Sequence, residues 1–406
     1  MIGIGVNIVI GGSRVETQVG LVATAATGIG TTSFTANWNA FSGAQYYLLD
    51  VSLNSSFSTF VYQDQVILAP TTAYVVIGLT ENTTYYYRVR ASTDAYIDPD
   101  YLAFFNRVVA AGGFLTIAEQ DSTKQLVADL KSNSLWTPMK AIYPMVGASA
   151  AACAQNLKSS SFTGTFTSGW TFASSGVTPN GTSAYMSTGL TPSANLSLNN
   201  ASISVYLRTN SIGLKCDISV IQDSVAGAND QLNIYPRFVD EAYFRIFDGS
   251  SATVANTNSQ GWYLANRVSS AGTRNFKNST LTTKTVASGT INTSQIILGA
   301  GGNVAGTAAA FSDRQNAFAS IGDGLTDTQA SNFYTTVQKF NQSLNRQVGA
   351  QIVSDTDAQA YIDRVYTAGG TLTNTEATAV NQLTIDLKSN GTWSSMKAIY
   401  PMIGAS

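Results

Sequence analysis

The chain has 406 residues, which at roughly 150 residues per domain predicts two to four domains. Hydrophobic residues make up 44% of it and aromatic residues 10%, enough to give each domain a buried core. Only 11% of the residues are charged, with 22 Lys and Arg against 24 Asp and Glu, so the basic footprint of a nucleic-acid-binding protein is missing. The sequence contains no histidine, which excludes His-dependent catalytic triads and His-ligated metal sites. Composition therefore favours a structural or binding role over catalysis.

The cysteines and the apolar segments exclude further classes. Cys153 and Cys216 are too few and too far apart in sequence for a disulfide framework or a thiolate metal site, so we expect two small buried residues. No window approaches the roughly 18 consecutive apolar residues of a membrane span. Residues 1–12 lack the basic region and the cleavage site of a signal peptide. We expect no membrane partner.

The first 25 residues carry Ile and Val in alternation, with few charges. We interpret residues 1–25 as an extended N-terminal arm that can add a strand to another surface, and therefore as the better candidate for the anchoring end. The alternative is a disordered leader. The residues that would make the attachment are Ile2, Ile4, Val6, Ile8 and Ile10.

Residues 26–95 have the pattern of a small β-sandwich. Apolar residues alternate with polar ones over 34–38, 47–51, 74–76 and 85–91, and polar turns separate these strands. The run 79–91 resembles the end of a fibronectin type III domain, with Tyr85 at the tyrosine corner and Trp38 as the buried tryptophan of the second strand. It departs from that family at Glu81, where a proline usually stands.

One stretch of the chain occurs twice, at a constant offset of 257 residues. Arg107–Glu119 returns as Arg364–Glu376, Asp129–Asn133 as Asp386–Asn390, Trp136 as Trp393, and Met139–Met145 as Met396–Met402. A constant offset means that neither copy has an insertion relative to the other. We expect a hairpin of two helices in each copy, over residues 96–140 and 353–406.

The ends of these helices are marked in the sequence. Asp98 caps the first helix, and Gly112 and Gly113 end it. The second helix opens with a capping box, Thr116 with Glu119, which recurs as Thr373 with Glu376. Capping explains both glutamates without a catalytic role. Trp136 and Trp393 follow the helix ends, where they pack over the hairpin or, as the alternative, stack on a sugar.

Between the copies, residues 141–348 contain short strands with Gly and Asn turns, which are typical of a jelly roll. The segment 316–325 leads into a helix that begins with the capping box of Thr326 and Gln329. This final segment, with its helix, resembles the last strand and terminal helix of concanavalin-A-like and laminin-G-like jelly rolls. The predicted fold is therefore mainly β and multi-domain, a fibronectin type III sandwich and a concanavalin-A-like jelly roll joined and followed by αα-hairpins.

The combined unit of hairpin and jelly roll, over residues 98–406, resembles a module of structural proteins from tailed bacteriophages that infect Bacteroides, the crAss-like phages in particular. The motifs that carry the resemblance are the two copies of Met-Lys-Ala-Ile-Tyr-Pro-Met, Thr178–Thr182 and the closing Ile-Gly-Asp-Gly-Leu. The resemblance implies a non-enzymatic head fibre or tail fibre on the virion surface, made in the host cytoplasm. Its partners would be capsid or tail proteins. No catalytic residue is carried over.

Three kinds of ligand site are conceivable, and for each of them the residues also have a structural explanation. A glycosidase needs two carboxylates across a cleft, and the acidic clusters Asp240–Glu241 and Asp323 with Asp327 fit loop and capping positions better. We expect no cofactor; the weaker alternative is calcium on scattered carboxylates, namely Asp217, Asp223, Asp230, Asp240, Asp248 and Asp313. A sugar platform on the jelly roll would use aromatic residues that core packing also explains, namely Trp170, Tyr185, Trp262 and Tyr263.

The second copy of Ala-Ile-Tyr-Pro-Met ends the sequence at Ser406 instead of running into a jelly roll. We expect this orphaned strand and its hairpin to pack on a neighbouring subunit and to give a homo-oligomer, a dimer or a trimer. The residues concerned are Trp393, Ile399, Tyr400 and Met402. The alternative is that the duplication simply ended there. The competing function is a carbohydrate-binding adhesin whose jelly roll holds host-surface or mucosal glycans.

Overall fold

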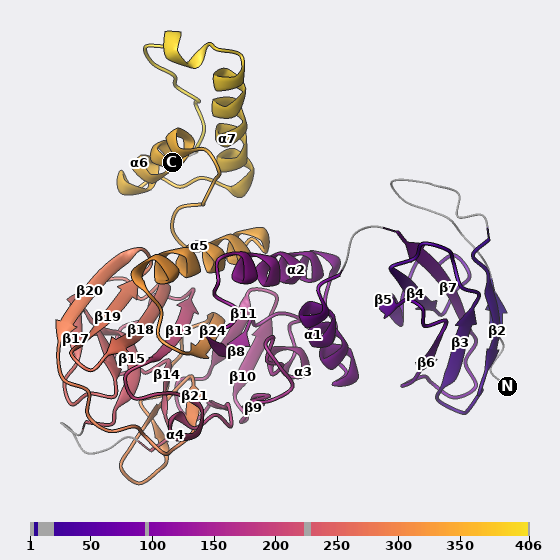
Figure 1. The fold of residues 1–406 in the computed structure, drawn as a ribbon, viewed down its shortest axis with the longest axis horizontal. Coiled ribbons are helices and arrows are strands. Elements are labelled where there is room, and N and C mark those ends of the chain that lie inside the picture. The colour runs from indigo at the N-terminus through magenta and orange to yellow at the C-terminus, as the bar shows by residue number, and fades with distance from the viewer. Residues whose placement is uncertain (1–3, 7–19, 94–96, 223–228, 405–406) are drawn as a thin grey trace. The chain divides into compact units, whose positions relative to one another are not determined.

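The computed structural model describes residues 4–6, 20–93, 97–222 and 229–404. Within it the chain divides into two units, Met1–Ile97 and Asp98–Ser406 (Figure 1). The described residues of the first unit form strands and no helix, and the second unit combines two large sheets with helices. The mainly β, multi-domain fold predicted from the sequence is confirmed.

The N-terminal unit is a sandwich of two sheets. The three-stranded sheet has the order β2 (Ala23–Thr27), β3 (Phe34–Trp38), β6 (Ala73–Val76), and the four-stranded sheet the order β1 (Ile4–Val6), β7 (Tyr85–Ser92), β4 (Tyr46–Ser52), β5 (Tyr62–Leu68). Alternate residues of β7 are buried along its whole length, because one face of the strand covers the core. Trp38 and Tyr47 meet in that core with ring centroids 5.5 Å apart.

The predicted tyrosine corner is present. Tyr85 is buried, and the backbone N–H of Thr80 donates a hydrogen bond of 2.9 Å to its hydroxyl. This bond fixes the turn that precedes β7, as in fibronectin type III sandwiches. Glu81, at the position where proline is usual, does not prevent it.

The predicted boundary of the N-terminal arm at residue 25 is wrong, because the sandwich begins earlier. Leu21 and Ala23 are buried in its core, and β2 starts at Ala23. The described part of the arm, β1, pairs in parallel with β7 of its own sandwich, Ile4 opposite Tyr85. The other predicted attachment residues, Ile2, Ile8 and Ile10, lie outside the described residues.

The jelly roll of the second unit consists of two stacked sheets (Figure 1). The eight-stranded sheet has the order β10 (Trp170–Ala173), β11 (Gly176–Pro179), β24 (Asn316–Gly322), β13 (Ala201–Leu207), β18 (Gly261–Ser269), β19 (Gly272–Lys277), β20 (Thr280–Thr285), with β8 (Met139–Tyr143) paired to β24. The seven-stranded sheet has the order β17 (Ala252–Ala255), β16 (Glu241–Ile246), β15 (Leu232–Phe238), β14 (Ile218–Val220), β21 (Ile296–Leu298), β12 (Met186–Ser187), β9 (Thr165–Phe166). Shorter elements complete the loops, namely α3 (Ala150–Cys153), α4 (Pro192–Asn195), β22 (Gly301–Gly302) and β23 (Ala308–Ala309).

The eight-stranded sheet is covered on both faces at its central strands. Its inner face packs on the other sheet through residues such as Val205 and Ile321. Its outer face is covered by α5 (Asp327–Ser343), whose Phe333 contacts the rings of Trp262 and Phe318 at 5.5 and 5.9 Å. All seven residues of β13 and of β24 are therefore buried, without the alternation of a half-exposed strand.

The first helical hairpin, α1 (Pro99–Ala110) and α2 (Ile117–Ser132), belongs to the same body. Figure 1 shows α2 beside α5, and the hydroxyls of Ser343 and Ser122 form a hydrogen bond of 2.8 Å between them. The predicted caps are confirmed. Asp98 caps α1, and a capping box opens α2 and another opens α5.

Two ion pairs are buried inside the jelly roll. Arg314 donates to Asp217 over 2.8 Å, and Arg267 donates to Asp248 over 3.0 Å. Arg314 also donates to the backbone carbonyls of Ser211 and Lys215, so its charge is distributed among several acceptors. Burial raises the pKa of Asp217, and the Arg314 charge opposes this rise.

We predict that Arg314→Met strongly destabilises the protein, because Asp217 would remain buried without its cation. The expected loss is about 3–5 kcal/mol of unfolding free energy, measured by urea titration at pH 7. The matched control is Lys124→Met, which removes an exposed ion pair with Asp121 and should cost under about 1 kcal/mol. Equal losses in the two variants would contradict a structural role for the buried pair.

Candidate functional site

The predicted sugar platform is wrong for two of its four residues. Trp262 and Tyr263 are fully buried, since they lie on the two faces of β18, a central strand. Trp262 packs beneath α5 against Phe333, and Tyr263 packs in the sandwich core against Phe244. Neither ring can face a sugar.

The other two platform residues lie at one end of the sandwich. Trp170 is half-buried, with its ring 5.1 Å from that of Phe166. Tyr185 is half-exposed, and its backbone N–H and carbonyl both bind Thr167. A role for Trp170 and Tyr185 in sugar binding stays a prediction.

The carboxylates considered for catalysis or calcium binding each have a local partner where the structure describes them. The partners are Arg314 for Asp217, Asn292 for Asp230, Arg237 for Asp240, Tyr243 for Glu241, Arg267 for Asp248, Lys215 for Asp313, Lys140 for Asp323 and Arg274 for Asp327. Asp223 lies outside the described residues. In the described parts of the chain, His, Cys, Asp and Glu form no group of three or more that could hold a metal ion.

Cys153 and Cys216 are both buried and free, and burial raises the pKa of Cys153 to about 12. The described helices include none that is both long enough and apolar enough to span a membrane. The second helical hairpin is a further candidate for a functional role.

The second hairpin consists of α6 (Thr356–Thr367), α7 (Asn374–Ser389), the 3-10 turn η1 (Trp393–Ser395) and a tail over residues 396–404. Its internal contacts repeat those of the first hairpin. Lys388 pairs with the cap residue Asp355 and with Asp357, as Lys131 pairs with the corresponding residues Asp98 and Asp100. Each lysine also lies 5.2 Å from the ring of the following tryptophan, Trp393 or Trp136. The packing interpretation of these tryptophans is therefore supported.

In both hairpins the glutamate of the capping box also binds the backbone of the segment that follows the second helix. Glu119 accepts a hydrogen bond of 2.8 Å from the N–H of Gly147, and Glu376 accepts one of 3.0 Å from Gly404. Backbone N–H groups of Thr373 and Gly404 lower the pKa of Glu376. The caps could be predicted from the sequence, whereas this second bond was not predicted; its signal is the glycine that recurs as Gly147 and Gly404.

The two hairpins differ in what covers them. Leu126 is 1% exposed, whereas its counterpart Leu383 is 39% exposed. In the strand that follows, Tyr143 is fully buried and its counterpart Tyr400 is 75% exposed. The second copy therefore presents surfaces that the first copy hides.

The cover of the first copy is the jelly roll. β8 pairs antiparallel with β24, Tyr143 opposite Ala319. The buried guanidinium of Arg346 donates to the carbonyls of Pro144 and Met145 at 2.6 and 2.8 Å. In the described chain, the tail over 396–404 has no strand partner of this kind.

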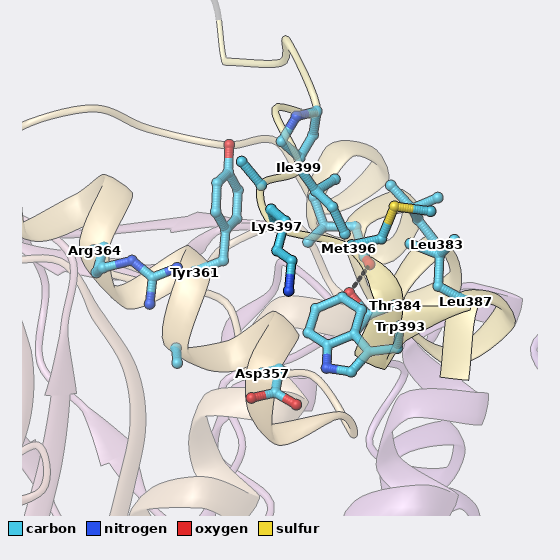
Figure 2. Close-up of a pocket in the computed structure, with 14 residues that line it drawn as sticks. Asp357, Tyr361, Arg364, Leu383, Thr384, Leu387, Trp393, Met396, Lys397 and Ile399 are labelled. Atoms are coloured by element: carbon cyan, nitrogen blue, oxygen red, sulfur yellow. Dashed lines mark hydrogen bonds between the residues drawn. The ribbon is translucent and has the colours of Figure 1, made fainter. Parts of the chain in front are cut away.

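The second hairpin contains a groove of about 330 Å³ between α6, α7 and the tail (Figure 2). Tyr361 and Arg364 come from α6, and Leu383 and Leu387 come from α7. The remaining labelled wall residues are Asp357, Thr384, Trp393, Met396, Lys397 and Ile399. The groove is thus lined by apolar side chains together with the charged side chains of Asp357, Arg364 and Lys397.

The predicted oligomerisation residues fall into two sets. Trp393 and Ile399 line the groove. Tyr400 and Met402 do not line it, and Met402 is 87% exposed. That all four contact a neighbouring subunit stays a prediction.

No protein-family model matches the chain, and no curated protein matches it. Domain 4 of AbnA, a GH43 extracellular arabinanase from Geobacillus stearothermophilus solved with arabinotriose, is 14% identical and has a TM-score of 0.34 over 48% of this chain and 98% of that one. The CBM40 of the Ruminococcus gnavus IT-sialidase is 17% identical, with a TM-score of 0.26 over 34% and 84%. A Trypanosoma rangeli sialidase with sialic acid is 7% identical, with a TM-score of 0.37 over 52% and 38%. The fold assignment rests on the strand topology described above.

The two copies provide a matched pair of substitutions. We expect Leu126→Ala to cost about 2–5 kcal/mol of unfolding free energy, because it leaves a cavity under the jelly roll. Leu383→Ala should cost under about 1 kcal/mol, because its side chain is already partly in water. Urea titrations of both variants measure the difference. A loss at Leu383 as large as that at Leu126 would mean that the second hairpin is covered in solution.

Proposed function

We propose that the protein is a non-enzymatic structural component of a tailed-phage virion, a head fibre or a tail fibre, whose β-sandwich units act as spacers. The observation that carries the proposal is the duplicated hairpin. The same internal contacts occur twice, once beneath a jelly roll and once exposed. A protein that hides a surface in one copy and presents it in the other is suited to assembly.

The exposed apolar residues support an assembly role. Met396 is 45% exposed, and Tyr400 and Met402 are exposed further along the same tail. Apolar side chains gathered in one short segment mark an interaction site in water-soluble proteins. We propose that Tyr400 and Met402 contact a neighbouring copy and give a dimer or a trimer.

The placement on a virion surface comes from the resemblance of the module over residues 98–406 to phage structural proteins. It fits a chain with 11% charged residues and neutral sandwich surfaces. Capsid or tail proteins are the proposed partners. The N-terminal arm is the proposed anchor, and deletion of residues 2–20 should then prevent incorporation into virions.

The alternative proposal is a carbohydrate-binding adhesin. It is favoured by the partial exposure of Trp170 and Tyr185 at one end of the jelly roll. Aromatic faces of this kind stack on sugars. Binding on a glycan array that Trp170→Ala abolishes would promote this function over that of a spacer.

We predict a dimer or trimer in sedimentation equilibrium at micromolar concentration. Deletion of residues 396–406 should yield a monomer, because it removes Tyr400 and Met402. The control is Val239→Asp, which changes an exposed apolar residue of the jelly roll and should leave the mass unchanged. A monomer in the full chain, unaltered by the deletion, would contradict the proposed assembly through the tail.

A further inference from the structure

In the first copy, a segment of the same chain binds the hairpin and the strand that follows it. Leu157 of this segment is fully buried, and its N–H donates to the carbonyl of Ile142 over 2.8 Å. The side chain of Asn156 accepts a hydrogen bond of 2.9 Å from the N–H of Ile142 and donates one of 3.2 Å to the carbonyl of Lys140. Asn156 and Leu157 therefore bind the backbone of the strand that follows the hairpin.

Two side chains of the hairpin complete this contact. Arg107 donates to the carbonyls of Asn156 and Leu157, at 2.7 and 3.4 Å. The ammonium of Lys158 lies 4.3 Å from the ring centroid of Trp136, close enough for a cation–π interaction. The segment Asn-Leu-Lys is thus held at three successive residues.

The hairpin residues that hold it all recur in the second copy. Arg107 corresponds to Arg364, Trp136 to Trp393, and Ile142 to Ile399. These three counterparts line the groove in Figure 2. Arg364 is exposed, and in the described chain its side chain has no hydrogen-bond partner. The binding residues are present, and no segment of the described chain occupies the groove between them.

We infer that this groove is a peptide-binding site for an extended Asn-Leu-Lys segment of a jelly-roll module carried by another polypeptide. Arg364 would donate to the segment's backbone carbonyls, and the leucine would enter the apolar base near Leu383 and Leu387. The lysine would lie over Trp393, near the carboxylate of Asp357. This assignment deepens the docking role proposed above, and it rests on that proposal only in requiring that the hairpin meets a partner.

The charged residues around Lys158 in the first copy have counterparts at the groove. Burial lowers the pKa of Lys158, the negative charge of Asp100 opposes that effect, and the positive charges of Lys131 and Lys140 add to it. Asp357, the counterpart of Asp100, and Lys397, the counterpart of Lys140, both line the groove (Figure 2). A cation over Trp393 would therefore meet an attractive carboxylate and a repulsive ammonium.

A second copy of this chain is not the expected occupant. In each copy of the chain Leu157 is already buried, and Arg107 of the first hairpin already binds its carbonyl. That hairpin also has the more apolar helix, with Phe104 and Phe105 where the second has Tyr361 and Ile362. Exchange would replace a stronger contact by a weaker one, so the occupant is a module whose Asn-Leu-Lys segment is uncovered.

The test uses the full chain and a fluorescein-labelled peptide of residues 150–162 in which Cys153→Ser prevents oxidation. We expect saturable, one-to-one binding by fluorescence anisotropy in 0.15 M salt. Arg364→Ala in the chain should weaken binding at least about tenfold, since it removes charge-assisted hydrogen bonds to the peptide. Leu157→Asp in the peptide should abolish binding, because the groove base is apolar.

The control variant is Arg237→Ala, which removes an arginine of the jelly roll outside the groove and should bind the peptide like the original chain. Binding that is absent, or equal in the Arg364→Ala and Arg237→Ala variants, would overturn the inference. If the peptide disperses a self-associated form of the chain, a second copy is the occupant and the assignment to another polypeptide is wrong. Loss of the oligomer on deletion of residues 396–406 without any peptide binding would overturn this inference and leave the proposed assembly intact.

Discussion

The central strands of the eight-stranded sheet of the jelly roll are buried on both faces, and this constraint determines what surrounds them. Tyr263 points into the sandwich, while its neighbour Trp262 points out toward α5. Without a cover on the outer face, large aromatic rings would lie in water, at a free-energy cost of the order of 25 cal/mol per Å² of exposed apolar surface. The helix α5 removes that cost. The strand β8, which follows the first hairpin, pairs with β24 and extends the sheet. The first hairpin therefore belongs to the jelly-roll fold.

The second hairpin keeps the same geometry without a sheet beneath it. Its caps, its lysine ion pairs and the bond from Gly404 to Glu376 are all formed within the hairpin. A small apolar cluster around Ile362, Leu372 and Ala377 supports them. The hairpin shape is therefore specified locally, whereas its cover is not, and this separation allows one motif to be internal in one place and exposed in another.

Prediction from sequence succeeded where the signal is local. Capping boxes need only residues three apart, so the starts of α2, α5 and α7 could be predicted. Strands with one solvent-exposed face, such as β7, show an alternation of buried and more exposed residues. β18 does not, because both of its faces are covered, and Trp262 was therefore open to misinterpretation as a surface residue. The early start of the first sandwich at Leu21 depends on long-range packing that no local pattern records.

The groove of the second hairpin could not be predicted for a different reason. The repeated residues run from Asp98 to Ser149 in the first copy, and the segment bound to the first hairpin, Asn156 to Lys158, comes after them. Comparison of the two copies in sequence alone therefore shows conserved helices and no missing ligand. Only the contacts of Arg107 and Ile142 reveal that the repeated stretch is one half of an interface. The ligand of the second copy can therefore be inferred from the first copy. There the contacts show which backbone groups, which apolar side chain and which charged side chain bind the hairpin.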